Sequence, residues 1–466
     1  MKIYLHNTLT GKKEEFVPLK KSLFGRPKVG MYHCGPTVYN YPHIGNLRAY
    51  VFADSLKRLM KAAGYKVAQV INITDVGHLV SDADSGEDKM EKAKKREQKS
   101  AWDIAKFYTE AFFENLSDLN VDTEGTIFPR ATDFIKEQIA IVRLLEKKSL
   151  TYRTSDGIYF DTSKFPDYGK LGHIDLSGIR EGERIGVNEE KRNPTDFALW
   201  KFSPAGEKRD MEWESPWGKG FPGWHIECSA MSMRYLGETF DIHTGGIDHI
   251  PVHHQNEIAQ SEGATGKQFV RYWMHVAFMN IAGAKMAKSE GNFLTLDVLK
   301  EKSFSPMDYR YFLLGARYST PLSFTWEALE AARNAYRRLN GAVCKLPSGG
   351  KVDAAYWDKA LSGLADDLDT PKALATIWEI LRDDKLSPAD KKATILKIDS
   401  LLGLAKADEA PVEEEKVPEA VSALAQEREV ARRNKNWSRS DELRNEIAKL
   451  GYDVKDTSDG QRIMKR

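Results

Sequence analysis

The order of elements between residues 29 and 74 constrains the fold more than any other feature of the sequence. Residues 29–33 form a short apolar run that ends at a Gly-Pro turn, and residues 46–63 carry apolar side chains at helical spacing. Gly64 is suited to end that helix, and residues 66–74 are apolar enough for a buried strand. This β-α-β order predicts an α/β fold built on a Rossmann-like, doubly wound parallel sheet. Such sheets bind nucleotides at the carboxyl ends of their strands.

The rest of the chain divides around this unit, and its 466 residues are enough for several domains. Turn signals multiply between residues 120 and 222, which indicates an inserted domain, and strands resume near 240–243 and 272–276. An acidic, proline-containing stretch then precedes a small terminal module. The predicted division is 1–119 and 223–278 for the two halves of the sheet domain, 120–222 for the insertion, 279–325 for a loop region after the sheet, 326–405 for a helical domain, 406–419 for a linker and 420–466 for the module.

Composition excludes several classes of protein. Lys and Arg total 69 against 68 Asp and Glu, so any nucleic-acid surface must be a local patch. The N-terminus has no apolar signal region, and no stretch approaches the ~18 apolar residues of a membrane span, so we expect a cytoplasmic protein with no membrane partner. The three cysteines are too few and too scattered for a disulfide framework, and we expect Cys344 to be a buried structural thiol.

Two short motifs carry groups suited to a nucleotide. His43-Ile44-Gly45-Asn46 lies between strand and helix, where an imidazole and a carboxamide can approach phosphate oxygens; a turn with an N-cap asparagine is the alternative. Lys285-Met286-Ala287-Lys288-Ser289 holds two lysines three residues apart, which suits a clamp on a triphosphate. An exposed lysine pair on a turn is the alternative for this second motif.

A third set of residues has the chemistry of a metal site. Cys34 follows the first strand, Cys228 lies just after the insertion, and His253 and Glu257 are four residues apart, on one face of a helix. Two thiolates, an imidazole and a carboxylate suit Zn²⁺. No CxxC motif is present, and unpaired cysteines are often small buried apolar side chains. The rival ligands by residue type are His225, Glu227, His243, His249 and His254.

Taken together, these motifs resemble those of the class I aminoacyl-tRNA synthetases. A HIGH-like motif opens the helix, an insertion follows, and a KMSKS-like loop begins 242 residues after His43. Four segments resemble the cysteinyl-tRNA synthetase family in particular, and the resemblance runs nearly from end to end. These segments are residues 34–40, 223–229, 253–257 and 436–466.

The resemblance implies a role for each matching position. It implies one Zn²⁺ per chain and selects His253 over His254. The implied zinc ligands are Cys34, Cys228, His253 and Glu257, and the implied cysteine-pocket residues are Cys34, Thr74 and Trp224. The implied ATP-binding residues are His43, Gly45, Asn46, Gly245, Gly246, Asp248, Lys285 and Lys288, of which His43, Asn46, Lys285 and Lys288 are catalytic. It also places the KMSKS loop and contact with the tRNA stem in residues 279–325.

The sequence departs from the family pattern at four positions. Asn46 stands where the HIGH motif has its final histidine, and Ala287 replaces the middle serine of KMSKS. Thr244 and His249 interrupt the more usual Gly-rich, apolar sequence around Asp248. An asparagine still donates a hydrogen bond and both lysines of the loop are kept, so we expect the activity to be tuned and not lost.

The implied reaction joins L-cysteine to tRNA(Cys). The cysteine carboxylate attacks the α-phosphate of ATP-Mg²⁺, and the cysteinyl-adenylate then transfers its cysteinyl group to the terminal ribose 2′-OH. Cysteine and serine differ by one atom, and an apolar pocket discriminates such pairs by only ~1–3 kcal/mol. Because Zn²⁺ binds a thiolate far better than a hydroxyl, the hypothesis is that zinc selects the substrate sulfur.

The C-terminal module has its own sequence support as an RNA contact. Residues 428–466 hold eleven Lys and Arg against seven Asp and Glu, a local net charge of +4. Trp437 is flanked by basic residues, a combination that stacks on unpaired bases, although an ordinary amphipathic helix pair is the alternative. The resemblance places anticodon binding in this module, and the expected contacts are Arg432, Arg433, Trp437 and Arg439.

Two other functions remain open. A related ligase joins activated cysteine to an amino sugar, but it needs no anticodon-binding module. A zinc-stabilised RNA-binding protein without catalysis is the second alternative, and the intact His43, Lys285 and Lys288 disfavour it. The expected partners are therefore tRNA(Cys), L-cysteine and ATP, and we expect a monomer.

Overall fold

The chain forms two compact units, Met1–Asp408 and Glu409–Arg466, which are described separately. The computed structural model describes residues 1–19, 26–76, 89–171, 189–204, 206, 209–281, 284–285, 293–405, 418–457 and 460–465. Among these residues, no helix has the length and apolarity to cross a membrane.

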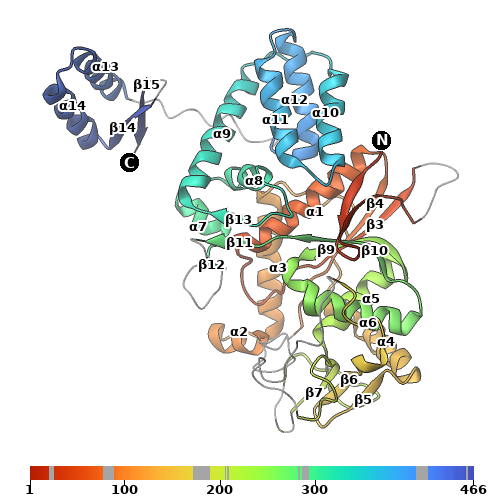
Figure 1. Cartoon of the computed structure of the whole chain (residues 1–466). Coiled ribbons are helices and arrows are strands. Elements are labelled where there is room, and N and C mark those ends of the chain that lie inside the picture. The colour runs from red at the N-terminus through yellow and green to blue at the C-terminus, as the bar shows by residue number, and fades with distance from the viewer. Residues whose placement is uncertain are drawn as a thin grey trace. The chain divides into compact units, whose positions relative to one another are not determined.

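A parallel sheet organises the first unit. Its hydrogen-bonded order is β10-β9-β3-β4, and every neighbouring pair is parallel (Figure 1). The four strands are β3 (Lys28–His33), β4 (Lys66–Ile71), β9 (Phe240–Gly246) and β10 (Val270–Val276). The chain enters at β3, runs outward to β4, and returns after the insertion to the other side of β3, so the strand order reverses between β3 and β9.

A fifth segment extends the sheet beyond β4. Ile127 and Arg130 form isolated parallel bridges with Val70 and Ile73. The spatial order is then that of a doubly wound Rossmann sheet, which confirms the predicted fold class. These two bridges lie inside residues 120–222, the stretch predicted as the insertion.

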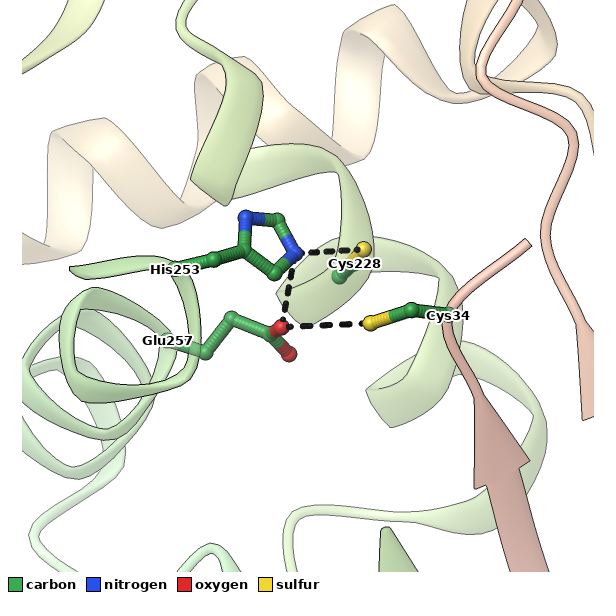
Figure 2. A group of neighbouring side chains, drawn as sticks. All are labelled: Cys34, Cys228, His253 and Glu257. Carbon is green, nitrogen blue, oxygen red and sulfur yellow. Dashed lines mark hydrogen bonds and ion pairs between the residues drawn. The ribbon is translucent and has the colours of Figure 1, made fainter. Parts of the chain in front are cut away.

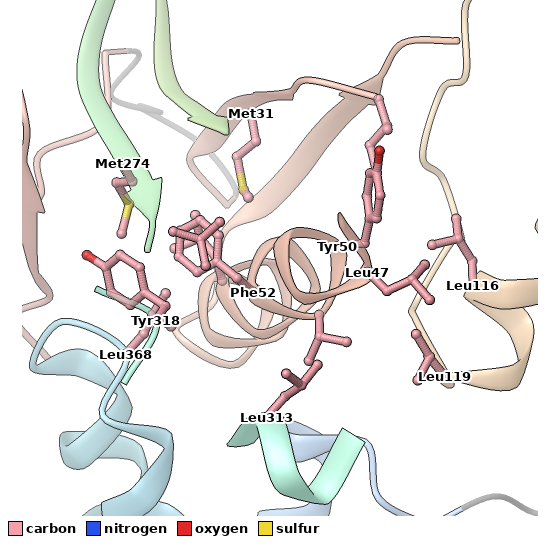
Figure 3. Close-up of a cluster of buried hydrophobic side chains, with 14 of the residues drawn as sticks. Met31, Leu47, Tyr50, Phe52, Leu116, Leu119, Met274, Leu313, Tyr318 and Leu368 are labelled. Carbon is pink, nitrogen blue, oxygen red and sulfur yellow. The ribbon is translucent and has the colours of Figure 1, made fainter. Parts of the chain in front are cut away.

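Helix α1 (Ile44–Ala62) packs at the centre of the first unit, as Figure 3 shows. Side chains from the sheet, from α3 (Ala101–Asp118) and from the helical region surround it, and Phe52 stacks on Tyr318 at 4.4 Å. The predicted end of this helix is confirmed, because Gly64 has φ +90°, a conformation that glycine adopts without strain. The alternative that makes Asn46 the N-cap is wrong: the cap is His43, three residues earlier.

The insertion carries its own antiparallel sheet and core. The sheet order is β5-β6-β7-β8, and Phe160 and Trp200 are among its fully buried residues. Helix α4 (Ile135–Lys147) packs on this core, and α5 (Trp224–Leu236) leads back to the main sheet. The strands are β5 (Thr151–Arg153), β6 (Gly157–Phe160), β7 (Phe197–Phe202) and β8 (Gly220–Pro222).

Short elements surround the main sheet. At the N-terminus, β1 (Tyr4–Asn7) and β2 (Lys12–Glu15) form a hairpin. Helices α2 (Lys89–Glu97) and α3 lie side by side, and a π-helical turn, Ile250–His254, leads into α6 (Gln255–Thr265) (Figure 1). A small sheet follows β10, with strands β11 (Met279–Ile281), β12 (Ala284–Lys285) and β13 (Leu322–Phe324), accompanied by α7 (Leu296–Glu301) and α8 (Pro306–Leu314).

The predicted helical domain follows. Asp369 caps α11 with proline in its first turn, as the sequence predicts. A fully buried ion pair between Arg310 on α8 and Asp54 on α1 ties the sheet domain to this region, and Arg310 also donates to the carbonyl oxygen of Leu402. The prediction of a buried Cys344 is wrong, because this last residue of α9 lies on the exposed side of the helix. The four helices are α9 (Trp326–Cys344), α10 (Ala354–Ala365), α11 (Thr370–Arg382) and α12 (Pro388–Leu402).

In residues 418–457 and 460–465, the part of the second unit that the structure describes, two helices are followed by a hairpin. These elements are α13 (Glu419–Arg433), α14 (Trp437–Lys449), β14 (Tyr452–Thr457) and β15 (Gly460–Lys465). The small core of this unit includes Val421, Ala425, Ile447 and Val454. Arg428 is buried and donates to both carboxylate oxygens of Asp456 at 2.9 Å, which joins α13 to the hairpin.

Candidate active site and metal centre

A pocket of about 430 Å³ opens at the carboxyl ends of β3 and β9, where the strand order reverses. This is the place where doubly wound sheets bind their ligands. Eleven of the predicted site residues line it, although they come from segments far apart in the sequence. They are Cys34, His43, Gly45, Asn46, Thr74, Trp224, Cys228, Gly245, Gly246, Asp248 and His253.

The HIGH-like motif forms the first turn of α1. The backbone N–H of Asn46 donates to His43 Nδ1 at 3.0 Å, and the backbone N–H of His43 donates to Asn46 Oδ1 at 3.2 Å. This reciprocal pair is a capping box, and it fixes both side chains at the positive end of the helix dipole. The ring of His43 also meets Phe293 edge-on at 5.7 Å. The motif is therefore both a helix cap and a rigid edge of the pocket.

The end of β9 requires its two glycines. A Cβ on Gly245 would lie 2.6 Å from Cε1 of His254, and one on Gly246 would lie 2.2 Å from a carboxylate oxygen of Asp248. Both distances are well below van der Waals contact, so a side chain at either position would displace these residues. Close packing against His254 and Asp248 therefore accounts for both glycines, which also line the pocket.

Four buried side chains converge, as Figure 2 shows, and three of them, Cys34, Cys228 and His253, also line the pocket. The donor atoms of Cys34, Cys228, His253 and Glu257 all lie within 4.8 Å of one another. Nε2 of His253 is 3.5 Å from Sγ of Cys228 and 3.0 Å from Oε1 of Glu257, and Sγ of Cys34 is 3.9 Å from the same oxygen. The four residues come from the end of β3, α5, the π-helical turn and α6. The predicted cluster is thus brought together, at a spacing that one metal ion can bridge.

The charges of this cluster favour metal binding. Burial alone would raise the pKa of the Cys228 thiol, but hydrogen bonding with Cys34 and the charge of His253 bring it down to about 6. Burial likewise opposes the charged form of Glu257, yet His243 and His253 lower its pKa to about 2. Burial strongly raises the pKa of the Cys34 thiol, with Cys228 adding to the effect. Cys228 and Glu257 thus favour their charged forms, and against the effect of burial they in turn raise the pKa of His253 to about 10, so the positive charge of this imidazole occupies the role that a divalent cation could take.

A second donor set overlaps the first. Cys34, His243, His254 and Glu257 also lie within 4.8 Å of one another. Of the imidazoles concerned, only His253 lines the pocket, so the first set is the one that faces a substrate. His243 Nε2 lies 2.9 Å from Oε2 of Glu257, where it orients that carboxylate. Sγ of Cys34 lies 3.2 Å from Nε2 of His254, so both sets are compact and the choice of His253 over His254 stays a prediction.

Polar contacts behind the site include residues that sequence analysis missed. His254 Nδ1 lies 2.7 Å from His275 Nε2, and the Nδ1 atom of His33 lies 2.6 Å from Oγ1 of Thr244. Burial lowers the pKa of His33 to about 3 and holds that of His275 well below its ordinary value, so both imidazoles are neutral. Sequence analysis could have pointed to these residues, because three of the parallel strands each carry a histidine toward the end that faces the pocket. Thr244, a departure from the family pattern, is thus the partner of His33 across two strands.

The predicted cysteine pocket adjoins the cluster. The Thr74 hydroxyl donates to Glu227 at 3.3 Å and accepts from Asn72 at 2.9 Å, while the Trp224 ring lies 4.3 Å from that of His253. Burial, reinforced by the charges of Cys228 and Asp75, raises the pKa of Glu227 well above its ordinary value. This shift favours the neutral form of Glu227, in which the carboxyl adds no charge beside the site.

The KMSKS-like motif falls largely outside the described residues. Lys285 belongs to β12, which pairs with β11, but its side chain is not described. Residues 286–292, which include Ala287 and Lys288, lie outside the described residues.

The predicted RNA contacts of the second unit gather on α13 and α14. Trp437 is 58% exposed, and the guanidinium of Arg432 lies 5.7 Å from its ring centroid. Arg432 also pairs with Asp456, and Arg433 with Glu429, both at 2.6 Å. Arg439 has three acidic neighbours on the same two helices. Arg433, Trp437 and Arg439 are therefore exposed and Arg432 is partly exposed beside them, with the three arginines in surface ion pairs that cost little to exchange.

Two family models match the chain. One, described as the class I (C) tRNA synthetase catalytic domain, matches residues 21–334, and the other, the cysteinyl-tRNA ligase anticodon binding domain, matches residues 414–463. The chain is 49% identical to "Cysteine--tRNA ligase 1" of Burkholderia lata, over 99% of this chain and 97% of that protein. It is 42% identical to "Cysteine--tRNA ligase" of Treponema denticola, over 98% of both chains.

Solved structures share the fold at low sequence identity. A methionyl-tRNA synthetase of Mycobacterium tuberculosis, in complex with methionyl-adenylate, has a TM-score of 0.54 at 15% identity, over 81% of this chain and 90% of that one. The LeuRS of Agrobacterium radiobacter K84, in a ternary complex with tRNA and LeuAMS, has a TM-score of 0.58 at 12% identity, over 84% of each chain.

The parallel sheet, the insertion and the pocket at the strand ends are those of the class I aminoacyl-tRNA synthetases. Within that class, the chain belongs to the cysteine–tRNA ligase family. It is accordingly an enzyme that ligates cysteine to tRNA(Cys), and its second unit is an anticodon-binding domain. The amino-sugar ligase and the inactive RNA-binding protein are thereby excluded.

Proposed function

We propose that the pocket at the ends of β3 and β9 activates L-cysteine with ATP-Mg²⁺ as cysteinyl-adenylate, and that a Zn²⁺ ion beside it selects the substrate thiol. One observation carries this proposal: the donor atoms of Cys34, Cys228, His253 and Glu257 converge within 4.8 Å beside the pocket that contains the HIGH-like motif. Metal ligands and nucleotide-binding groups thus surround a single small space.

The donor set fits zinc. Two thiols, one imidazole and one carboxylate are borderline-soft ligands, and all four side chains are almost fully buried. When bound, Zn²⁺ would supply a Lewis acid that binds a thiolate far more strongly than a serine hydroxyl. His243 and Glu257 make the kind of outer contact that fixes a metal ligand's orientation.

The chain's own residues position ATP. His43 and Asn46 lie at the positive end of α1, where a phosphate is favoured, and the capping box holds them in place. Gly245, Gly246 and Asp248 line the pocket and are assigned to the ribose by their match to the family. Lys285 and Lys288 are assigned to the β- and γ-phosphates by their position in the motif.

The first step is an in-line displacement. An oxygen of the cysteine carboxylate forms a bond to the α-phosphorus while the bond to the bridging oxygen breaks, and pyrophosphate leaves. Because this reaction needs no covalent help from the protein, its residues act by positioning and by neutralising charge. In the second step, the terminal ribose hydroxyl of tRNA(Cys) attacks the activated carbonyl, and AMP leaves.

The test is ATP–pyrophosphate exchange with each of the twenty amino acids, before and after treatment with a chelator. We expect exchange with cysteine alone, loss of that exchange on chelation and recovery with added Zn²⁺. Exchange that continues in protein shown by metal analysis to be metal-free would contradict the role of zinc. Absence of exchange in the zinc-loaded enzyme, while tRNA charging persists, would contradict the adenylate.

A further inference from the structure

The aromatic edge of the pocket continues outward onto the surface of α3. Tyr41 lines the pocket, and its ring centroid lies 6.0 Å from that of Phe107 and 5.1 Å from that of Tyr108. Tyr108 is buried, but Phe107 is 40% exposed. Part of the Phe107 ring is therefore open to solvent one ring away from the pocket.

Positive charge is concentrated beside this ring. Residues 89–99 hold six Lys and Arg against two Glu, a local net charge of +4 in a chain whose total is +1. Nζ of Lys99 lies 4.9 Å from the ring centroid of Phe107. Lys89, at the other end of this segment, lines the pocket itself. Cations thus stand at both ends of the segment, Lys99 at the phenyl ring and Lys89 at the pocket, while Lys94 between them is paired with Asp210.

The segment is anchored to the pocket wall. Arg96 on α2 donates to the carbonyl oxygen of Tyr39 at 3.2 Å, and Tyr39 also lines the pocket. The Tyr108 hydroxyl donates to Glu97 at 2.6 Å, which ties the end of α2 to α3. These contacts give the exposed cations and the exposed ring a fixed position relative to the pocket.

A partly exposed aromatic ring beside cations matches the chemistry of unpaired nucleotides. Bases stack on the ring while the backbone phosphates meet Lys or Arg, and neither contact depends on the base sequence. In a duplex the bases already stack on one another, so an aromatic side chain gains such a contact only from an unpaired strand. The enzyme acts on the 3′ end of a tRNA, and that end has to reach the pocket from outside.

We propose that Phe107 and Lys99 bind the unpaired 3′ strand of tRNA at the entrance of the pocket, Phe107 by stacking on a base and Lys99 by contacting a phosphate. This surface, the 3′-strand entrance, comprises Tyr41, Lys99 and Phe107. The inference rests on the proposed reaction site, because the strand is placed by its path to that pocket. Its new content is the assignment of the strand to two side chains, Phe107 and Lys99, beside the pocket.

The first test compares two RNA hairpins that copy the acceptor arm of tRNA(Cys), with and without the unpaired 3′ nucleotides, on the full-length enzyme. Wild-type enzyme binds the hairpin with the tail more tightly. Phe107→Ala weakens binding of that hairpin by about tenfold and leaves the tailless hairpin unchanged. Phe107→Tyr, which keeps a ring, restores the difference. Equal weakening of both hairpins, or no weakening, overturns the proposal.

Phe113→Ala is the matched control. Phe113 lies on the same helix and is 37% exposed, but its ring packs edge-on against Phe128 at 4.9 Å. We expect this variant to bind both hairpins as the wild type does. If it lost the tail-dependent affinity as Phe107→Ala does, the effect would belong to α3 as a whole and the assignment of Phe107 would be wrong.

The second test concerns charge. Lys99→Ala should lower the slope of log affinity against log salt by about 0.7 for the tailed hairpin, the value for one contact with a single strand, and leave the tailless slope unchanged. An unchanged slope for the tailed hairpin counts against Lys99. Pyrophosphate exchange should be normal in both variants, since neither residue touches ATP or cysteine. Loss of exchange in the wild type would contradict the reaction site, whereas loss confined to these variants would contradict the 3′-strand entrance.

Discussion

The catalytic pocket and the anticodon-binding domain use polar side chains in opposite ways. At the pocket, Glu257 is completely buried and Cys228 is 1% exposed, and the metal-binding set spans 223 residues of sequence. In the anticodon-binding domain, Trp437 is 58% exposed, and the predicted RNA contacts lie on two consecutive helices. One site is assembled by the whole fold, while the other is carried by a local surface.

The difference has an energetic origin. A buried carboxylate or thiolate is costly unless partners surround it, so the four residues of the proposed metal centre depend on one another. Exposed arginines and an exposed tryptophan lose little hydration on binding, and each of them is predicted to make its own contact with RNA. Losses at the pocket should therefore be nearly complete, and losses in the anticodon-binding domain should be graded. Four experiments test this contrast.

The largest effect is expected for Cys228→Ser. It replaces a soft ligand by a hydroxyl within a buried set, so cysteine-dependent pyrophosphate exchange should fall by about 100-fold or more, beyond the cost of losing an outer contact of a metal site. Metal content measured on the purified protein should fall in parallel. Cys344→Ser, at the exposed end of α9, is the matched control and should change neither quantity. If Cys228→Ser kept its full metal content and rejected serine as the wild type does, the proposed interdependence of the buried residues would be wrong.

His43→Ala should have the next largest effect. It removes an imidazole at the phosphate-facing end of α1 and also the acceptor of the Asn46 N–H. Removing one preorganised transition-state donor costs about 100- to 1,000-fold in rate, so kcat of pyrophosphate exchange should drop with little change in the KM for cysteine. His43→Asn, which keeps a capping side chain, separates the two roles. If it restored full activity, the contribution of His43 would be the helix cap alone.

The fold could be predicted from local patterns only up to the point where distant segments pair. Apolar periodicity was enough for β3, α1 and β4, and Gly64 marked the helix end. The pairing of Ile127 and Arg130 with the β4 edge could not be read from the sequence, because that segment is short and contains a proline. The cap at His43 was missed because histidine is not among the residues that usually cap helices.

Prediction of the site had the same limit as prediction of the fold: local patterns could be read from the sequence, but contacts between distant segments could not. Spacing put His253 and Glu257 on one face, and the family pattern supplied Cys34 and Cys228, but a spacing rule has no information about the second set with His243 and His254. The contact between His33 and Thr244 depends on the register of two parallel strands, which the sequence alone does not fix. Cys344 was misjudged because residue type was considered without its place on the helix face.

Deleting residues 409–466 tests whether the two regions are energetically separate. The catalytic unit retains its whole pocket and core, so pyrophosphate exchange should be unchanged within about twofold. Charging of tRNA should fall on the order of 100-fold, the loss expected when two or more stacking or phosphate contacts disappear. Circular dichroism of the shortened protein would check that it is folded. Equal loss of both activities would mean that the domain supports the catalytic unit structurally.

Trp437→Ala should give the smallest effect of the four changes, and it tests a single predicted RNA contact of the anticodon-binding domain. The ring is exposed, and apart from the nearby guanidinium of Arg432 it can be removed without exposing a core, so the thermal midpoint should stay within about 1 °C. The KM for tRNA in charging should rise by about tenfold, as expected for one lost stack on an unpaired base, with kcat little changed. Leu450→Ala, at a residue 49% exposed just after α14, is the matched control and should leave KM unaltered.

A graded effect of this size, set against near-complete loss in Cys228→Ser, is the signature of a site whose contacts act independently. A loss as complete as that of Cys228→Ser would mean that the anticodon contacts are as interdependent as the buried ones.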